Sequence, residues 1–322
     1  MQYLYDLNDP KNFIAPITMK APDGHIIETQ HTILMPDKPR RHFTMTDSIM
    51  MKTRPGSIPN SHEHHVGYEI FFLDSGGMDI FIDGQKTYVK PGSIMLVQPY
   101  QAHGSTFYED TKYRGFFHDL PYNDEGDAGL LLREHNPDYM NDPDFPKEIA
   151  PLGDFYLREP HLDYAEVPPE QCRPIRHRER PMATFNLPGV TMKMITGRWE
   201  HGGLCEIWCF EMKKGFFAES YQYPANTDLY YVIEGKVKFK VYEEEFTAKE
   251  ECLVKIPKYA PRSFDVLEDA VVYDVGGMPR WDAYMTDRAS VLEREPERAA
   301  LPETFDELRK KFGIPYCKSG VR

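Results

Sequence analysis

Two stretches of the chain alternate apolar and polar residues in short runs that turn signals separate. The first covers residues 43–120 and includes YEIFFLDSGGMDIFIDGQKTYVKPGSIMLVQP, in which Ser-Gly-Gly, Asp-Gly and Pro-Gly interrupt the apolar runs. The second covers residues 184–281 and includes LYYVIEGKVKFKVYEEEF, whose V-K-F-K-V alternation is typical of a half-buried strand. Because a strand places successive side chains on opposite faces, both stretches predict antiparallel sandwiches or small barrels. The predicted fold class is therefore all-β, with two tandem units.

The segments outside these stretches complete the predicted organisation. Residues 1–42 form an N-terminal arm, and residues 121–183, rich in Asp, Glu, Pro and Arg, form a long irregular connector that either wraps the units or acts as a lid. Residues 282–322 form a C-terminal extension. Within it, LPETFDELRKKFGIP predicts a helix over residues 302–312, because proline suits a first helical turn, acids precede bases and Gly313 suits the stop.

The two β-units repeat one pattern at a nearly constant offset. Adding 159 to the first block gives the second, so that Gly56, His62, His64, Glu69 and Gly76 correspond to Gly215, Tyr221, Tyr223, Asp228 and Gly235. Further along, Pro99 and His103 match Pro257 and Pro261 at an offset of 158, which predicts a one-residue deletion. The pattern indicates one fold used twice.

Composition narrows the function classes. The 322 residues contain 51 Asp and Glu against 38 Lys and Arg, and the formal net charge of -13 repels phosphate backbones and anionic membranes. No apolar run approaches the roughly 20 residues of a membrane span, and no leader pattern opens the chain. We expect a cytoplasmic protein without nucleic-acid or membrane partners. The five cysteines form no CxxC pair, so a disulfide framework or zinc site is not expected.

Four side chains of the first unit have the character of metal ligands. His62 and His64 are two residues apart, so a strand directs both to one face, while Glu69 and His103 begin further strands. Three imidazoles and one carboxylate suit a divalent metal, with Mn or Fe preferred and Zn, Ni or Co able to substitute. We expect one divalent metal ion per chain.

These residues resemble the cupin superfamily. Residues 56–76 fit its first motif, G-x5-H-x-H-x4-E-x6-G, and residues 91–103 fit its second, P-G-x6-P-x3-H. Ser93 replaces the usual aspartate of the second motif, and Phe107 replaces the usual terminal asparagine. The arrangement resembles bicupins such as oxalate decarboxylases, quercetin dioxygenases and gentisate dioxygenases. The resemblance implies two tandem jelly-roll barrels, the first of which holds a metal through the four residues above.

The second unit departs from this motif at the ligand positions, which Tyr221, Tyr223, Asp228 and Pro261 occupy. Tyrosine with a lone aspartate is a poor divalent-metal set at neutral pH. We predict a degenerate, metal-free C-terminal barrel that serves as a structural or dimerising half. Because exposed strand edges need cover, we also expect a homodimer or higher homo-oligomer.

Other residues of the first unit are candidates for catalysis and substrate binding. Glu69 is first a ligand, and in cupins the corresponding carboxylate sometimes doubles as a base. His118 is a candidate acid–base partner, unless it is a core or surface histidine, and Arg54 is a candidate anion clamp, unless it is a surface arginine. The candidate substrate contacts, which equally serve as apolar barrel lining, are Phe71, Met95, Ser105 and Phe107.

The expected function is a metal-dependent enzyme for a small oxygen-rich cyclic substrate. Such a metal lowers the pKa of water, polarises an enolate oxygen or, as Fe(II), binds O2. A cavity lined by Phe71, Phe81, Phe107 and Phe116 suits an enolisable diketone or a phenol. The favoured reaction is hydrolytic C–C ring opening of the dihydrophloroglucinol cyclohydrolase type. The alternatives are an Fe(II)-dependent ring-cleaving dioxygenase of the gentisate or quercetin type and a non-catalytic small-molecule-binding cupin.

Overall fold

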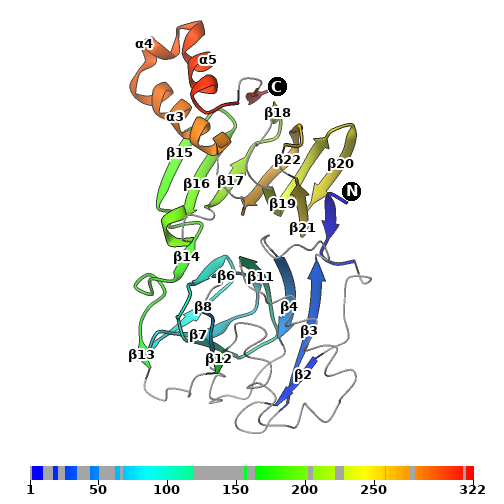
Figure 1. Cartoon of the computed structure of the whole chain (residues 1–322), viewed down its shortest axis with the longest axis vertical. Helices are drawn as coiled ribbons and strands as arrows, with labels where there is room; N and C mark the ends of the chain where they lie inside the picture. Colours follow the sequence, from blue (N-terminus) through cyan, green and yellow to red (C-terminus); the bar gives the residue numbers. More distant parts are fainter. Residues whose placement is uncertain are drawn as a thin grey trace. The chain divides into compact units, whose positions relative to one another are not determined.

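Figure 1 shows the computed structural model of the chain. The described residues are 2–9, 17–20, 26–34, 44–50, 62–65, 68–118, 156–157, 164–201, 206–221, 228–257, 259–275, 280–314 and 317–322. The description covers the backbone alone at residues 17–20, 26–34, 44–50, 117–118, 156–157, 201, 220–221 and 280. The chain forms two compact units, which we call the N-terminal barrel (Asp9–His177) and the C-terminal barrel (Met1–Asn8 with Arg178–Arg322).

The N-terminal barrel consists of two sheets. One has the strand order β14-β9-β6-β11-β4-β3-β2 and the other β12-β5-β10-β7-β8-β13. The first sheet comprises β2 (Ile17–Lys20), β3 (Ile26–Leu34), β4 (Thr44–Met50), β6 (Tyr68–Ser75), β9 (Ser93–Val97), β11 (Thr111–His118) and β14 (Ile175–His177). The second comprises β5 (His62–Glu63), β7 (Met78–Ile82), β8 (Gln85–Val89), β10 (His103–Phe107), β12 (Tyr156–Leu157) and β13 (Ala165–Glu166). Leu73 and Met95 of the first sheet share one apolar core with Ile80 and Phe107 of the second, so the core lies between the sheets.

The C-terminal barrel repeats this plan with one continuous, folded sheet. Its main path is β1-β21-β19-β22-β17-β16-β15, to which β20 adds at β19, β18 at β22 and β23 at β18. The strands are β1 (Leu4–Asp6), β15 (Ala183–Leu187), β16 (Val190–Thr196), β17 (Ile207–Met212), β18 (Phe216–Tyr221), β19 (Asp228–Val241), β20 (Glu244–Lys249), β21 (Cys252–Ile256), β22 (Arg262–Asp274) and β23 (Lys318–Val321). Register shifts interrupt the pairing of β19 with β22, and irregularities of this kind bend long strands.

A glycine ends the first motif in each barrel, where a neighbouring backbone comes very close. Gly76 has a φ of +76° and Gly235 a φ of +82°. A Cβ at Gly76 would clash with the carbonyl oxygen of Asp110, and one at Gly235 with that of Asp269. Both positions therefore require glycine, which alone combines this conformation with the absence of a side chain.

The described helices belong to the C-terminal barrel. They are the short 3-10 helix η3 (Arg198–His201) and the helices α3 (Arg280–Arg294), α4 (Pro296–Ala299) and α5 (Pro302–Lys311). Helix α5 ends shortly before Gly313, whose φ is +67°. The sequence pattern did not predict α3, and the expected boundary at residue 281 falls inside it. None of the described helices combines the length and the apolar character that crossing a membrane requires.

The described segments divide differently from the predicted arm and connector. Strand β1 pairs with β21 in the C-terminal barrel, whereas β2 and β3 extend a sheet of the N-terminal barrel. Within the expected connector, β12, β13 and β14 pair with β5, β8 and β9 of the N-terminal barrel. Strands of two or three residues exist only because an edge is present to pair with, so local sequence does not reveal them. Residues 119–155 lie outside the described part.

Strand register shows that the offset of 159 is unbroken between the barrels. In the N-terminal barrel, His103 pairs with His62 and Ile82. In the C-terminal barrel, Arg262 pairs with Tyr221 and Val241. Adding 159 to 62, 82 and 103 gives 221, 241 and 262. The expected one-residue deletion is therefore wrong, and the counterpart of His103 is Arg262, not Pro261.

Candidate metal centre

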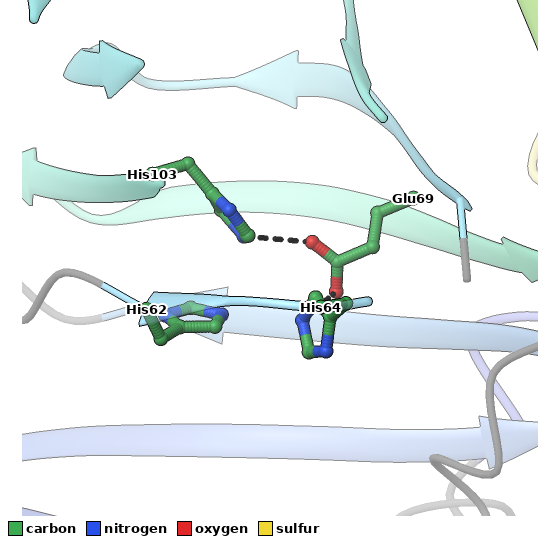
Figure 2. A group of neighbouring side chains, drawn as sticks. All are labelled: His62, His64, Glu69 and His103. Atoms are coloured by element: carbon green, nitrogen blue, oxygen red, sulfur yellow. Dashed lines mark ion pairs between the residues drawn. The ribbon is translucent and has the colours of Figure 1, made fainter. Parts of the chain in front are cut away.

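The four predicted ligands come together inside the N-terminal barrel, and their side chains converge (Figure 2). His62 begins the short strand β5, and His64 follows directly after it. Glu69 is the second residue of β6, and His103 is the first residue of β10, directly opposite His62. One ligand strand thus comes from the seven-stranded sheet and two from the six-stranded sheet.

The donor atoms of these four residues all lie within 4.8 Å of one another. The two carboxylate oxygens of Glu69 face different imidazoles, with Oε1 3.3 Å from Nε2 of His64 and Oε2 2.8 Å from Nε2 of His103. The ring centroids of His62 and His103 are 4.2 Å apart. The prediction that spacing brings three imidazoles and one carboxylate together is borne out by this geometry.

The imidazoles beside Glu69 determine the charge of its carboxyl group. The side chains of His64 and Glu69 are 1% and 3% exposed. Burial by itself raises the pKa of Glu69, but the imidazoles of His64 and His103 outweigh it and hold the pKa of that carboxyl well below its usual range. The carboxylate is thus ionised and available to a cation at neutral pH.

The tautomer of His103 follows from its neighbour. Nδ1 of His103 lies 3.0 Å from the carbonyl oxygen of Gln101, which only accepts, so Nδ1 carries the proton and Nε2 presents a lone pair. This Nε2 lies 2.8 Å from Oε2 of Glu69. Two lone-pair donors that face one space fit a metal ion, and a carbonyl that orients an imidazole is a usual support of such ligands.

Glu63 and His65 alternate with the ligands along the same segment. Glu63 is buried and lies 2.8 Å from Nε2 of His65, which stacks on Tyr100 at 4.5 Å between ring centroids. The N–H of Tyr100 donates to the carbonyl oxygen of His64 over 2.6 Å. Sequence reasoning missed Tyr100, whose φ of +65° places it in a tight turn that no glycine marks.

The four predicted substrate contacts lie on strands of this barrel. Three of them belong to its apolar core or pack against that core. Met95 and Phe107 are buried in the core between the sheets, and the half-buried Phe71 packs against that core opposite Met95. Ser105 is half-buried and lies two residues beyond His103 on β10. Their contact with a substrate stays a prediction.

Tyr113 is a lining residue that sequence reasoning missed. Its ring lies edge-on to Phe71 at 5.6 Å and parallel to Phe107 at 6.1 Å. Its place on the face of Phe71 follows from the pairing of β11 with β6, in which Tyr113 is opposite Leu73 and Gly115 is opposite Phe71.

Two phenylalanines expected in the cavity lie elsewhere. Phe116 pairs with Ile70, one position away from Glu69, and packs against Phe72 at 5.2 Å. Phe81 packs against Tyr164 at 4.6 Å. Neither belongs to the core shared by Phe71 and Phe107, because alternation places them on the opposite faces of their strands. The expectation that they line the cavity is wrong.

The side chains of two candidate catalytic residues lie outside the described part of the structure. His118 ends β11 in register with Tyr68, whereas residue 117 is the one opposite Glu69. Only the backbone of His118 is described, so its role as an acid–base partner stays a prediction. Arg54 lies outside the described residues.

Comparison with known proteins gives a fold relationship. No family profile matches the chain, and no curated protein matches its sequence. The structure is similar to that of oxalate decarboxylase from Bacillus subtilis at pH 4.6, with a TM-score of 0.52 and 11% identity over 91% of this chain and 83% of that chain. A structure of the same enzyme, from work on its Mn(II) centres, has a TM-score of 0.52 and 11% identity over 95% and 86% of the two chains.

At this level of identity the similarity concerns the fold. It agrees with the duplicated strand order and with the unbroken offset between the two barrels. The metal-binding group is an observation on this chain itself. The chain has the tandem cupin fold of the bicupins, with a His-His-Glu-His metal-binding group in its N-terminal barrel.

Proposed function

We propose that the N-terminal barrel is a divalent-metal-dependent catalytic site that opens a small, enolisable cyclic diketone by hydrolysis of a C–C bond. The observation that carries this proposal is the convergence of four metal donors beside an aromatic lining. His62, His64, Glu69 and His103 present their donor atoms within 4.8 Å of one another. Three nitrogens and one oxygen favour Mn(II) or Fe(II).

A bound ion of this kind would supply a Lewis acid that acidifies water and polarises a substrate oxygen. The protein's own groups would compensate charge and orient the ligands. The Glu69 carboxylate, ionised at neutral pH, offsets positive charge, and the Gln101 carbonyl keeps His103 in the ligating tautomer. Because Glu69 faces His64 and His103 at the centre of the donor group, we assign it as a ligand and not as the base.

The aromatic lining favours a cyclic substrate over a small dianion such as oxalate. Phe71, Tyr113 and Phe107 form a continuous set of aromatic contacts, with Met95 opposite Phe71. Such surfaces bind a flat hydrocarbon ring and exclude water from it. Ser105, half-buried on β10 beyond His103, offers a hydroxyl to a ring oxygen.

The test begins with protein purified without oxygen, in which metal analysis is expected to find about one Mn or Fe per chain. Cyclic 1,3-diketones, phenols and oxalate are then assayed with and without air. Ring opening of a diketone that proceeds equally without O2 supports the proposal. His62→Ala is expected to lose both metal and turnover, whereas His177→Gln, which changes a histidine outside the ligand group, is expected to keep both.

Three other outcomes would replace the hydrolytic assignment. Turnover that requires O2 and Fe(II) would assign a dioxygenase. Release of CO2 from oxalate, the reaction named for the B. subtilis enzyme of the same fold, would assign a decarboxylase. Binding of these compounds without any turnover would assign a non-catalytic binding protein.

A further inference from the structure

The C-terminal barrel has a cation where the N-terminal barrel has its metal-binding group. Arg262 corresponds to His103 and Asp228 to Glu69, both at the offset of 159. Nη1 of Arg262 lies 2.5 Å from Oδ2 of Asp228, and the two residues are 2% and 5% exposed. A buried guanidinium therefore meets the carboxylate that a metal would otherwise meet.

The first turn of α3 packs into the core of this barrel through Trp281. Trp281 is fully buried and packs edge-on against Phe210 at 5.5 Å and against Phe264 at 6.1 Å between ring centroids. Phe264, at the offset of 159, corresponds to Ser105, a predicted substrate contact of the N-terminal barrel. The indole thus reaches a position equivalent to one where a substrate is expected in the other barrel.

The residue after Trp281 brings a carboxyl group to the same region. Asp282 is 2% exposed, and its Oδ1 has no hydrogen-bond partner among the described residues. Its electrostatic neighbours come from three other elements: Asp274 at the end of β22, Asp228 at the start of β19 and Glu206 before β17. Among the described residues, Arg262 brings a positive charge to this group of carboxyls through its ion pair with Asp228.

We propose that the C-terminal barrel has its own internal ligands, with the Arg262 guanidinium in place of the metal and the first turn of α3, through Trp281 and Asp282, in place of a substrate. This inference concerns a barrel that the proposed reaction does not use. It gives a physical reason for the prediction that the C-terminal barrel takes no metal, because a fixed positive charge repels a second cation.

The buried carboxyl groups make the docking of the first turn of α3, which we call the closure, dependent on pH. Burial, followed by the charges of Asp274 and Asp228, raises the pKa of Asp282 well above its usual value. Burial also raises the pKa of Asp228, to about 6, against the opposing effect of Arg262. A carboxyl with a raised folded-state pKa contributes stability below its unfolded pKa and loses it as pH rises through the folded value. Docking of the first turn of α3 should therefore weaken as the pH rises through the folded-state pKa values of Asp228 and Asp282.

Asp282→Asn tests this closure, because it keeps the shape of the neutral acid and removes its ionisation. The control is Asp287→Asn, on the same helix but in an ion pair with Lys311. Hydrogen exchange of the α3 amides is measured from pH 5 to pH 9 relative to an unstructured peptide of the same sequence. We expect protection in the parent and in Asp287→Asn to fall with pH, by up to tenfold per pH unit, and protection in Asp282→Asn to fall less. Equal pH dependence in all three proteins would overturn the closure.

Trp281→Ala tests the occupancy directly. Removal of the indole leaves an apolar cavity, and free indole is expected to bind it and raise the unfolding temperature. The same concentration of indole should leave Trp199→Ala unaffected, because Trp199 is 65% exposed. A folded Trp281→Ala protein that gains nothing from indole would contradict the proposal.

The cation is tested by a double-mutant cycle. Arg262→Met leaves Asp228 buried without its partner and is expected to lower stability strongly, whereas Arg262→Met with Asp228→Asn should recover much of the loss. Metal analysis of both variants should still give one ion per chain. Additive losses, or a second metal ion in the parent protein, would overturn the assignment of Arg262 as the resident cation.

Discussion

At the scale of single residues, the metal centre depends on protonation as much as on position. The Gln101 carbonyl fixes the proton of His103 on Nδ1, and the two oxygens of Glu69 face different imidazoles. Glu63, which is also buried, instead bonds to His65. Two buried glutamates six residues apart therefore have different roles because strand alternation separates their partners.

This difference predicts the effect of removing each carboxylate. Glu69→Gln keeps the size of the side chain but removes the charge and a donor oxygen, so we expect Mn(II) affinity to fall by more than the roughly 10–100-fold that loss of an outer-shell partner costs. Glu63→Gln is the matched control and should keep affinity near that of the parent. Calorimetric titration of metal-free protein measures both. Equal losses in the two variants would mean that Glu69 is not a ligand.

At the scale of elements, β5 is a two-residue strand that carries a metal ligand. Its support comes from three sides: His62 pairs with His103 of β10, residue 157 of β12 pairs with His62, and the Tyr100 N–H bonds to the His64 carbonyl. So short a strand has little stability of its own. The ligand spacing is therefore held by residues far away in sequence.

The Tyr100 contact can be separated into its backbone and ring parts. Tyr100→Pro removes the N–H and cannot adopt the φ of +65°, so we expect at least a several-fold loss of Mn(II) affinity, since one hydrogen bond contributes about 1 kcal/mol. Tyr100→Gly keeps the N–H and the turn but lacks the ring that stacks on His65. If Tyr100→Gly loses as much affinity as Tyr100→Pro, the ring rather than the backbone bond positions the ligands.

At the scale of the whole molecule, the two barrels share one fold but differ in the groups that stand at the position of the metal centre. The N-terminal barrel offers a group of four metal donors, whereas the C-terminal barrel pairs Asp228 with Arg262 and includes Trp281 in its core. Stability of the first should depend on an external ion, and stability of the second should not.

Chelation is expected to affect the two barrels unequally. Metal that binds only the folded N-terminal barrel stabilises it by about 2.7 kcal/mol at a free concentration one hundred times the Kd. Removal by EDTA should therefore increase hydrogen exchange in β6 and β10 and leave β19 and β22 unchanged. Equal changes in both barrels would show that the C-terminal barrel also depends on the metal.

Local sequence determined the ligand set and the all-β class of this protein. His62 and His64 share a face because a strand has a period of two, and Gly76 and Gly235 mark close backbone approaches that exclude a side chain. The strand period is a property of neighbouring residues, so the printed sequence contains it, and the two glycines stand out because they repeat at one offset. Helix 302–312 was likewise predictable, because its start and stop signals are local.

Tertiary structure alone decided the rest. The counterpart of His103 is Arg262 because strand pairing, not matching prolines, sets the register. Tyr113 joins the lining because β11 pairs with β6, and β12 to β14 are strands because edges were present to accept them. Helix α3 joins the core of the C-terminal barrel through contacts between distant residues, as the packing of Trp281 against Phe210 shows. Contacts between distant segments depend on the whole fold, and no short pattern encodes them.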